Sequence, residues 1–318
     1  MNILVTGGLG FIGHNVVQIL KRLHHNVIVV DNQTTYGIVP KSELDFLIGE
    51  RAFRITPCTT HTADIKDQGT MEYIMQRHNI ELVIHLASFP RQKVVNANPC
   101  LGSQTMSEGL LNLLEAAKKY NVGKFVYVSS SMVYGNFDNN VVETVACNPQ
   151  GQYGIMKLAG EWLVKDYARR TDMSYIIVRP SAVYGPLDVE DRVISKFILT
   201  AMRDGVIKVN GANETLDFTY VDDAADGIVA ATLTKHQNQT YNITRSRSRT
   251  LLEAAELAIN IVGQGRIDVQ DKDADFPSRG ALNTQAAQQD LGFAPKIDIE
   301  QGFQRYYEWL KDSPYFNR

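Results

Sequence analysis

The chain begins with Met1-Asn-Ile-Leu-Val-Thr-Gly-Gly-Leu-Gly-Phe-Ile-Gly13, and these residues carry the clearest indication of the fold. Its Ile3-Leu4-Val5 run is typical of a strand that is buried on both faces. The run breaks into glycines and then continues as apolar residues at helical spacing. A strand, a glycine turn and a helix N-terminus together form an anion cradle, because unpaired backbone amides and the helix dipole favour phosphate. The spacing Gly7-x-x-Gly10-x-x-Gly13 therefore predicts a site for the pyrophosphate of a dinucleotide.

A second apolar strand at 26–30 ends in Asp31-Asn32. An acidic residue about 20 positions beyond such glycines is suited to accept hydrogen bonds from an adenosine ribose, and its charge repels a 2′-phosphate. We therefore predict that Asp31 lies at the ribose and that the cofactor is NAD rather than NADP.

Composition limits the class of protein. With 318 residues, 44% of them hydrophobic, the chain can bury a large core in one or two domains. A net charge of −3 gives no electrostatic reason to expect nucleic acid or an anionic membrane surface as a partner. No apolar run approaches the length of about 18 residues that a membrane span needs. The N-terminus lacks a charged, cleavable leader pattern, and the three scattered cysteines suggest reduced thiols without metal-ligand spacing, so we expect a cytoplasmic protein without a metal.

Strands and helices alternate along the first half of the chain. Expected strands follow the second one at 53–57, 82–86, 124–128 and 175–178, and the clearest helices are at 110–117 and 153–170. This alternation predicts an α/β fold, a Rossmann-type doubly wound parallel sheet with its site at the carboxyl ends of the strands.

The pattern loosens beyond Arg179. Helix-like segments at about 192–204 and 249–262 flank strand-like segments at 216–221 and 240–243. We expect a smaller mixed α/β domain that caps the sheet and binds substrate. The predicted division assigns residues 1–179 and about 217–243 to an NAD-binding domain, and 180–216 and 244–318 to the substrate-binding domain.

The residues that indicate chemistry are Ser129-Ser130-Ser131 at a strand end and Tyr153-x-x-x-Lys157 at the start of a long helix. Tyr and Lys at i and i+4 project from one helical face. An ammonium beside a phenol stabilises the phenolate and lowers a pKa that is normally about 10. A phenol with such a pKa can remove a proton from a substrate hydroxyl while a hydride leaves the same carbon, and a strand-end serine can hold that hydroxyl.

With these residues in view, the chain resembles the extended short-chain dehydrogenase/reductase family, and in particular its NAD-dependent nucleotide-sugar epimerase/dehydratase branch, which includes UDP-glucose 4-epimerase-like proteins. The matching motifs occur in the family's order and cover nearly the whole chain. They are Thr6-Gly-Gly-Leu-Gly-Phe-Ile-Gly13, Asp31-Asn32, Asp64-Ile65, His85-Leu-Ala-Ser88, Ser129-Ser-Ser-Met-Val-Tyr-Gly135, Tyr153-x-x-x-Lys157, Arg179-Pro-Ser-Ala-Val-Tyr-Gly-Pro186, Asp217-Phe-Thr-Tyr-Val-Asp-Asp223 and Leu291-Gly-Phe-x-Pro295.

The resemblance implies a role for each matched position. The catalytic residues would be Ser130, Tyr153 as acid/base, and Lys157. The cofactor-binding residues would be Gly7, Gly10, Phe11, Ile12 and Gly13 at the pyrophosphate, Asp31 and Asn32 at the ribose, Asp64 and Ile65 at the adenine, Leu86, Ala87, Ser88 and Ser129 along the channel, and Tyr153 and Lys157 near the nicotinamide. The substrate-binding residues would be Arg91, Ser130, Ser131, Tyr153 and Arg279. We interpret His85 as a packed strand residue without a catalytic part.

Departures from the family pattern narrow the function. Sugar 4,6-dehydratases carry an acidic pair where this chain has Ser131 and Met132, and related decarboxylases carry glutamate in place of Met132. Reversible oxidation and reduction at one carbon remains, and Asp31 favours a redox-neutral use of NAD. Ala182 and Leu216 stand where the family usually has Asn and Arg at the nucleotide diphosphate. The sugar, the base and even the presence of a nucleotide therefore stay open.

Three hypotheses follow. The first is an NAD-dependent epimerase that inverts C4 of a nucleotide-activated sugar through a 4-keto intermediate. The second is an NAD(P)-dependent ketoreductase or dehydrogenase of a related sugar or alcohol, and the third is a non-catalytic NAD-binding scaffold. The family commonly dimerises through two helices, so we also expect a homodimer through 110–120 and 161–170, with Leu111, Leu114, Trp162 and Tyr167 as candidate contacts. The alternative is that these residues simply cover the sheet.

Overall fold

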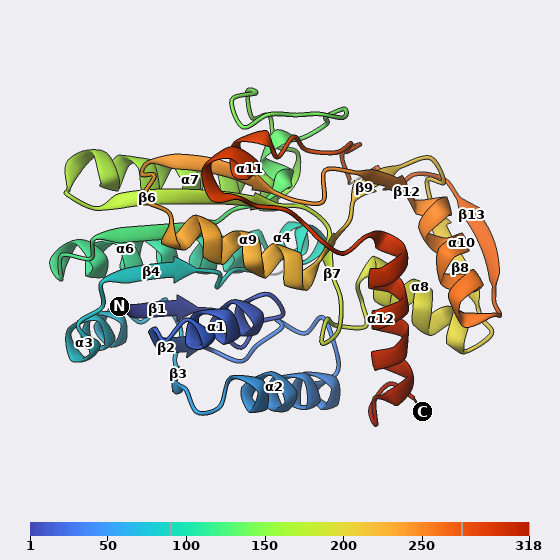
Figure 1. Ribbon diagram of the computed structural model, residues 1–318, viewed down its shortest axis with the longest axis horizontal. Helices are drawn as coiled ribbons and strands as arrows, with labels where there is room; N and C mark the ends of the chain where they lie inside the picture. The colour runs from blue at the N-terminus through green and yellow to red at the C-terminus, as the bar shows by residue number, and fades with distance from the viewer. Residues whose placement is uncertain (90, 275, 318) are drawn as a thin grey trace.

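A computed structural model describes residues 1–89, 91–274 and 276–317, and a seven-stranded parallel sheet lies at its centre (Figure 1). The strand order is β11-β6-β5-β4-β1-β2-β3, so that β1 lies between β4 and β2. The strands are β1 (Asn2–Thr6), β2 (Asn26–Asp31), β3 (Thr59–Thr62), β4 (Leu82–His85), β5 (Lys124–Val128), β6 (Ser174–Pro180) and β11 (Gln239–Ile243). This arrangement confirms the predicted Rossmann-type doubly wound sheet.

The central strands are buried on both faces, as their continuous apolar runs predict. Ile3, Leu4 and Val5 of β1 have no exposed surface. In register, Ile3 lies opposite Val27 of β2 and Leu82 of β4. Side chains that alternate between the two faces of this sheet supply two separate cores.

Helices cover both faces of the sheet, and Figure 1 shows α1 and α9 lying across the nearer face. The core on that side is shared by α1 (Gly13–Arg22), α2 (Lys41–Ile55), α9 (Val221–Leu233) and α11 (Gln285–Leu291). The core on the opposite side is shared by α3 (Gln68–His78), α6 (Gly109–Lys119) and α7 (Gly151–Arg170). Short helices precede α6 and follow β5: α4 (Gln92–Ala97), α5 (Pro99–Ser103), the π-helix η1 (Gln104–Glu108) and the 3₁₀ turn η2 (Ser131–Tyr134).

A further group of elements packs around a core of its own, beside the end of the sheet toward which the strands point (Figure 1). Its helices are α8 (Val193–Met202), α10 (Leu251–Val262) and α12 (Ile299–Asp312), and its strand pairs are β7 (Val183–Tyr184) with β10 (Thr219–Tyr220), β9 (Thr215–Asp217) with β12 (Ser248–Thr250), and β8 (Val206–Asn210) with β13 (Arg266–Gln270). Helices α8 and α10 are the ones expected near 192–204 and 249–262, whereas α12 was not predicted. The domain boundaries given above stay a prediction.

Two expectations between Asp31 and Asp64 were wrong. The stretch expected to be irregular contains α2, and the strand expected at 53–57 is replaced by the end of this helix and by β3 four residues later. Leu44, Leu47 and Ile55 have the spacing of a helix face, but charged residues separate them. Strand β3 has the sequence Thr-Thr-His-Thr and lies at the sheet edge, and none of its four residues is buried, so no apolar run indicates it.

The strand expected at 216–221 is divided into two. β9 pairs with β12 in the antiparallel sense, and β10 pairs with β7 in the parallel sense. The buried Phe218 lies at the division, where the chain passes from one small sheet to the other.

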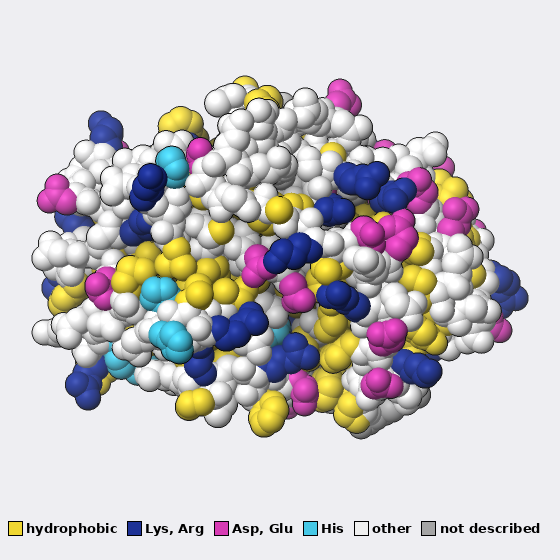
Figure 2. Space-filling view, in the orientation of Figure 1, with side chains coloured by type: hydrophobic (Ala, Val, Ile, Leu, Met, Phe, Trp, Pro, Cys, Tyr) yellow, Lys and Arg dark blue, Asp and Glu magenta, His cyan; other side chains and the backbone are white. Residues whose placement is uncertain are grey.

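Among the residues that the structure describes, no helix combines the length and the apolar character that crossing a membrane requires. On the face drawn in Figure 2, Lys and Arg side chains are interspersed with Asp and Glu side chains.

Candidate active site

A cleft of about 480 Å³ opens at the carboxyl ends of β1, β2, β4 and β5, the usual position for a ligand in this kind of sheet. Nearly all the predicted site residues line it. They are Gly7, Gly10, Phe11, Ile12, Gly13, Asp31, Asn32, Ile65, Leu86, Ala87, Ser88, Arg91, Ser129, Ser130, Ser131, Tyr153, Lys157 and Arg279. Asp64 stands just behind this lining, where it accepts a hydrogen bond from Asn32.

The glycine turn after β1 has the close packing that the sequence predicts. Gly7 has φ +72°, and a Cβ there would lie 2.7 Å from the backbone nitrogen of Ala87 on the β4 side of the cleft. A Cβ at Gly13 would collide with the Gly7 carbonyl oxygen. In the part of the chain that the structure describes, the amides of Phe11 and Ile12 donate to no protein acceptor. Free amides at a helix N-terminus suit a phosphate, so the turn fits the pyrophosphate of NAD.

Asp31 closes β2 beside this turn. Its Oδ2 accepts a hydrogen bond from the amide of Leu9 at 2.9 Å, and its Oδ1 accepts from the amide of Gln33 at 2.8 Å. Burial raises the pKa of Asp31, and both hydrogen bonds oppose that rise. The carboxylate is thus fixed at the strand end, where it fits the ribose of a dinucleotide.

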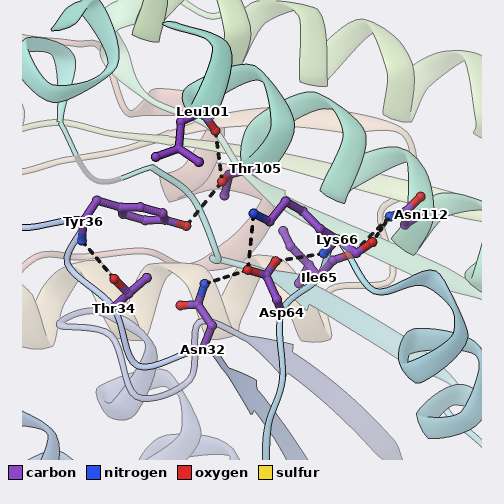
Figure 3. A network of polar contacts seen from close by, with 9 residues as sticks. All are labelled: Asn32, Thr34, Tyr36, Asp64, Ile65, Lys66, Leu101, Thr105 and Asn112. Carbon is purple, nitrogen blue, oxygen red and sulfur yellow. Dashed lines mark hydrogen bonds and ion pairs between the residues drawn. The ribbon is translucent and has the colours of Figure 1, made fainter. Parts of the chain in front are cut away.

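Asn32, the residue after Asp31, forms a small network with Asp64 (Figure 3). Nδ2 of Asn32 donates to Oδ2 of Asp64 at 3.2 Å, and the amide of Lys66 donates to the other carboxylate oxygen at 2.9 Å. Nδ2 of Asn112 on α6 donates to the carbonyl oxygens of Ile65 and Lys66 at 3.4 and 2.8 Å. These bonds fix the loop after β3 against α6, and they place Ile65 in the wall of the cleft near Asn32.

The predicted catalytic residues meet where β5 ends against the first turns of α7. Nζ of Lys157 lies 5.9 Å from the centre of the Tyr153 ring and donates to the carbonyl oxygen of Val128 at 2.8 Å. Ser130, two residues beyond β5, interacts with the Tyr153 hydroxyl and also accepts from the amide of Met132 at 3.2 Å. The structure therefore brings the serine, tyrosine and lysine together; their catalytic roles stay a prediction.

The pKa of Tyr153 differs from the sequence-based expectation. Burial raises it above the usual value, while the charge of Arg192 and the interaction with Ser130 lower it. Burial also lowers the pKa of Lys157 to about 7, against an opposing effect of Glu161. The expectation that the lysine ammonium lowers the Tyr153 pKa is therefore wrong for the protein alone, because Lys157 is itself buried and readily loses its charge.

The hydroxyls of the other two serines in the strand-end cluster donate hydrogen bonds to side chains of the protein. Oγ of Ser129 donates to Glu161 at 2.6 Å, and Oγ of Ser131 donates to Oγ of Ser181 at 3.1 Å. Met132 is nearly buried, with its sulfur 3.3 Å from Nη1 of Arg279. No carboxylate therefore stands at the two positions where a 4,6-dehydratase would need one.

His85 is a packed strand residue, as expected. It is 2% exposed, and its Nδ1 shares a hydrogen bond of 2.7 Å with the Thr6 hydroxyl. Burial and the charge of Lys157 lower its pKa to about 3, so the imidazole is neutral.

The two predicted substrate arginines differ in their surroundings. Arg91 forms an ion pair with the Asp191 carboxylate and also donates to the Asp191 carbonyl oxygen, so a substrate would have to compete with Asp191 for it. Arg279 has a buried Nε without a hydrogen-bond partner, and burial lowers its pKa to about 10. A poorly compensated cation in a cleft wall favours an anionic ligand. Both substrate-binding roles stay predictions.

Several lining residues were missed by the sequence analysis. Arg192, just before α8, lowers the pKa of Tyr153 through its charge. It was missed because the family motif that begins at Arg179 ends at Pro186, six residues earlier. Tyr36, Phe89 and Thr105 also line the cleft. Two features of the sequence could have indicated Tyr36 and Phe89. Tyr36 is an aromatic residue in the polar stretch after Asn32, and Phe89 directly follows Ser88.

The comparison with known families agrees with this site. A profile described as the NAD-dependent epimerase/dehydratase family matches residues 3–244. The chain belongs to this family. The family predicted from the motifs, with NAD as its cofactor, is thereby confirmed.

Individual relatives cover the chain almost from end to end. A Methanocaldococcus jannaschii protein with the provisional name UDP-glucose 4-epimerase is 32% identical over 98% of this chain and 99% of its own. The solved structure of a UDP-glucose 4-epimerase from Thermotoga maritima with UDP-glucose is 29% identical, has a TM-score of 0.87 and covers 98% of this chain and 99% of that one. The UDP-glucuronic acid 4-epimerase of Bacillus cereus, solved with UDP-glucuronic acid and NAD, is 27% identical, has a TM-score of 0.89 and gives the same coverage.

Proposed function

We propose that the protein is an NAD-dependent epimerase that inverts C4 of a nucleotide-activated sugar, with the cofactor recycled within each turnover. The observation that carries this proposal is the meeting of Ser130, Tyr153 and Lys157 at one end of a cleft whose other end is formed by the glycine turn and Asp31. The absence of a carboxylate at Ser131 and Met132 separates the site from a dehydratase. The relatives named above, epimerases of UDP-sugars, support the same activity.

Each residue then has a stated task. NAD, when bound, supplies the group that accepts the C4 hydride and returns it. The Ser130 hydroxyl holds the C4 oxygen, and the Tyr153 phenolate removes the proton from it. Tyr153 returns that proton after the keto sugar has presented its other face. Lys157 is fixed by Val128 at the end of β5, where its ammonium can also bind the nicotinamide ribose.

The proposal that the substrate carries a nucleotide diphosphate depends on Arg279. Its buried, unpartnered Nε lies in the cleft wall, so a diphosphate would compensate its charge. This site replaces the usual contacts at Ala182 and Leu216, which both line the cleft and offer no charge. The UDP-sugars named for the solved relatives make a UDP-sugar the first choice of substrate.

We further propose a cytoplasmic homodimer. Trp162 on α7 is 65% exposed, Ile155 lies on the same face two turns earlier at 48%, and Leu111 on α6 is 37% exposed. Leu114 and Tyr167 were wrongly expected to make intersubunit contacts, since they are buried within the chain at 0% and 6%. A Trp162→Glu variant should shift the molar mass measured by light scattering from dimer to monomer.

The decisive experiment incubates the purified protein with UDP-, GDP-, CDP- and dTDP-sugars without added cofactor. NMR identifies the products while the NADH absorbance band is followed. A C4 stereoisomer formed without net NADH supports the proposal and names the substrate. Net oxidation or reduction with stoichiometric NADH change would instead establish a dehydrogenase or ketoreductase.

A further inference from the structure

Tyr36 lies in the loop between β2 and α2, a stretch that the catalytic proposal does not use. The loop folds back on itself, because Tyr36 and Gly37 both have positive φ values, 54° and 77°, and the Tyr36 amide donates to Oγ1 of Thr34 at 3.1 Å. A non-glycine residue with such a φ is uncommon and indicates that the surroundings fix the turn. The turn directs the tyrosine ring out of its own loop (Figure 3).

The ring ends against the opposite side of the cleft. It stacks on Phe89, which follows β4, with 3.9 Å between ring centres and 27° between planes. Phe89 is 1% exposed and belongs to a small apolar cluster with Val95 and Met106, against which Tyr153 also packs. The Tyr36 side chain is therefore joined to a fixed surface that reaches the catalytic tyrosine.

A hydrogen bond completes the contact. The Tyr36 hydroxyl lies 3.3 Å from Oγ1 of Thr105 on η1, and Oγ1 donates its own hydrogen to the carbonyl oxygen of Leu101 at 3.2 Å. The Tyr36 hydroxyl is thus the donor to Thr105. Thr105 stands in a π-helical turn, a distortion that is frequent at functional sites.

The strand order shows that this contact spans the cleft. β1 lies between β4 and β2, and the glycine turn follows β1. A side chain that joins the loop after β2 to the loop after β4 therefore bridges the crevice at the end of β1. Asp31, the glycine turn and Ser88 line the same cleft as Tyr36, Phe89 and Thr105.

We propose that Tyr36 is a latch that closes the cofactor crevice and sets the rate at which NAD enters and leaves. The inference rests on the proposed function, because an epimerase must keep its reduced cofactor from one half-reaction to the next. A latch differs from an ordinary binding contact in one measurable respect: it slows association as well as dissociation.

The test measures both rate constants by stopped-flow fluorescence of NADH, with excess NAD displacing NADH in the dissociation experiment. Tyr36→Ala should raise the dissociation rate constant about tenfold through loss of the stack, and it should also raise the association rate constant. Tyr36→Phe removes the hydrogen bond and keeps the ring, and Thr105→Val removes the same bond together with the one to Leu101. Each should raise the dissociation rate constant about two- to tenfold, and the double variant should add nothing to either single one. Tyr73→Ala is the matched control, because Tyr73 is a 57% exposed tyrosine on α3.

The outcomes are distinct. If neither rate constant changes in folded Tyr36→Ala and Tyr36→Phe, or if dissociation rises while association does not, the latch is overturned. These measurements need no sugar substrate. If the Tyr36 variants exchange NADH faster than a wild-type protein that epimerises no sugar, the latch is supported and the proposed function is rejected. If the wild type epimerises a sugar and the variants exchange NADH at its rate, the proposed function is supported and the latch is rejected.

Discussion

Arg179 and Glu161 form a bidentate ion pair beneath the candidate active site. Nε of Arg179 donates to Oε1 of Glu161 at 2.9 Å, and Nη2 donates to Oε2 at 2.6 Å, with side chains only 4% and 1% exposed. Burial alone would lower the pKa of Arg179, but the bond to Glu161 raises it above its ordinary value. Oε1 also accepts from Ser129, so one carboxylate joins the end of β5, β6 and the turn of α7 that follows Lys157.

Removing one charge of this pair should destabilise the protein strongly. Glu161→Gln leaves a buried guanidinium without its counter-charge, which costs about 3–5 kcal/mol of the free energy of unfolding. Asp45→Asn is the control, because the exposed pair between Lys41 and Asp45 should contribute less than about 1 kcal/mol. Urea unfolding followed by circular dichroism measures both. Equal losses in the two variants would show that the buried pair contributes no more to stability than the exposed pair does.

The Tyr153 hydroxyl should be needed for turnover and not for cofactor binding. Tyr153→Phe should lower kcat by about 10²- to 10⁴-fold, the usual contribution of a positioned acid/base, because the proton of the C4 hydroxyl then has no acceptor. NADH affinity, measured by fluorescence titration, should stay within about twofold of the wild-type value, since the ring remains in place. A variant that retains full activity would assign the proton transfer to another group.

The pH profile should reflect the position of Arg192. Because burial raises the pKa of Tyr153, the phenolate fraction and kcat should increase as pH rises above neutrality. The charge of Arg192 lowers this pKa, so Arg192→Met should move the rising limb of the kcat profile to higher pH, and Arg192→Lys should move it less. If the rising limb of the kcat profile is unchanged in Arg192→Met, the charge of Arg192 has no effect on proton transfer by Tyr153.

The sequence predicts those parts of the structure that depend on local pattern. β1, β2 and β4 are continuous apolar runs because they are buried on both faces, and the glycine turn and Tyr153-x-x-x-Lys157 have fixed spacing. The edge strand β3, Thr-Thr-His-Thr, pairs only with β2 and has no buried residue, so it has no such run.

Features that depend on tertiary approach could not be predicted in the same way. The Tyr36–Phe89 stack joins loops from two different strands, and nothing in the spacing of the two residues indicates that they meet. The pKa values of Lys157 and Tyr153 follow from burial, which the i, i+4 relationship does not reveal.

Arg279 should contribute to substrate binding through its charge. Arg279→Met removes a cation with charge-assisted hydrogen bonds to a phosphate, so KM for the nucleotide sugar should rise about 10- to 100-fold with a smaller change in kcat. Arg279→Lys should give an intermediate KM, because lysine keeps the charge and loses the planar guanidinium. Arg266→Met, at an exposed position on β13, is the matched control. A normal KM in Arg279→Met would exclude this residue from the diphosphate site.

His85 should make the protein sensitive to acid. Burial holds its pKa in the folded protein at about 3, below the value of 6.5 expected in the unfolded chain, so the unfolded state takes up its proton first as pH falls. The free energy of unfolding therefore decreases below pH 6.5, by about 1.4 kcal/mol for each pH unit until the folded pKa is reached. His85→Gln has no such proton to bind, and its unfolding free energy should fall less steeply between pH 6.5 and 4. His14, which has a similarly lowered pKa, is present in both proteins, so the difference between the two urea-unfolding series isolates His85. His24→Gln, at an exposed position, should follow the wild-type curve, and parallel curves for His85→Gln and the wild type would mean that His85 is already protonated in the folded state.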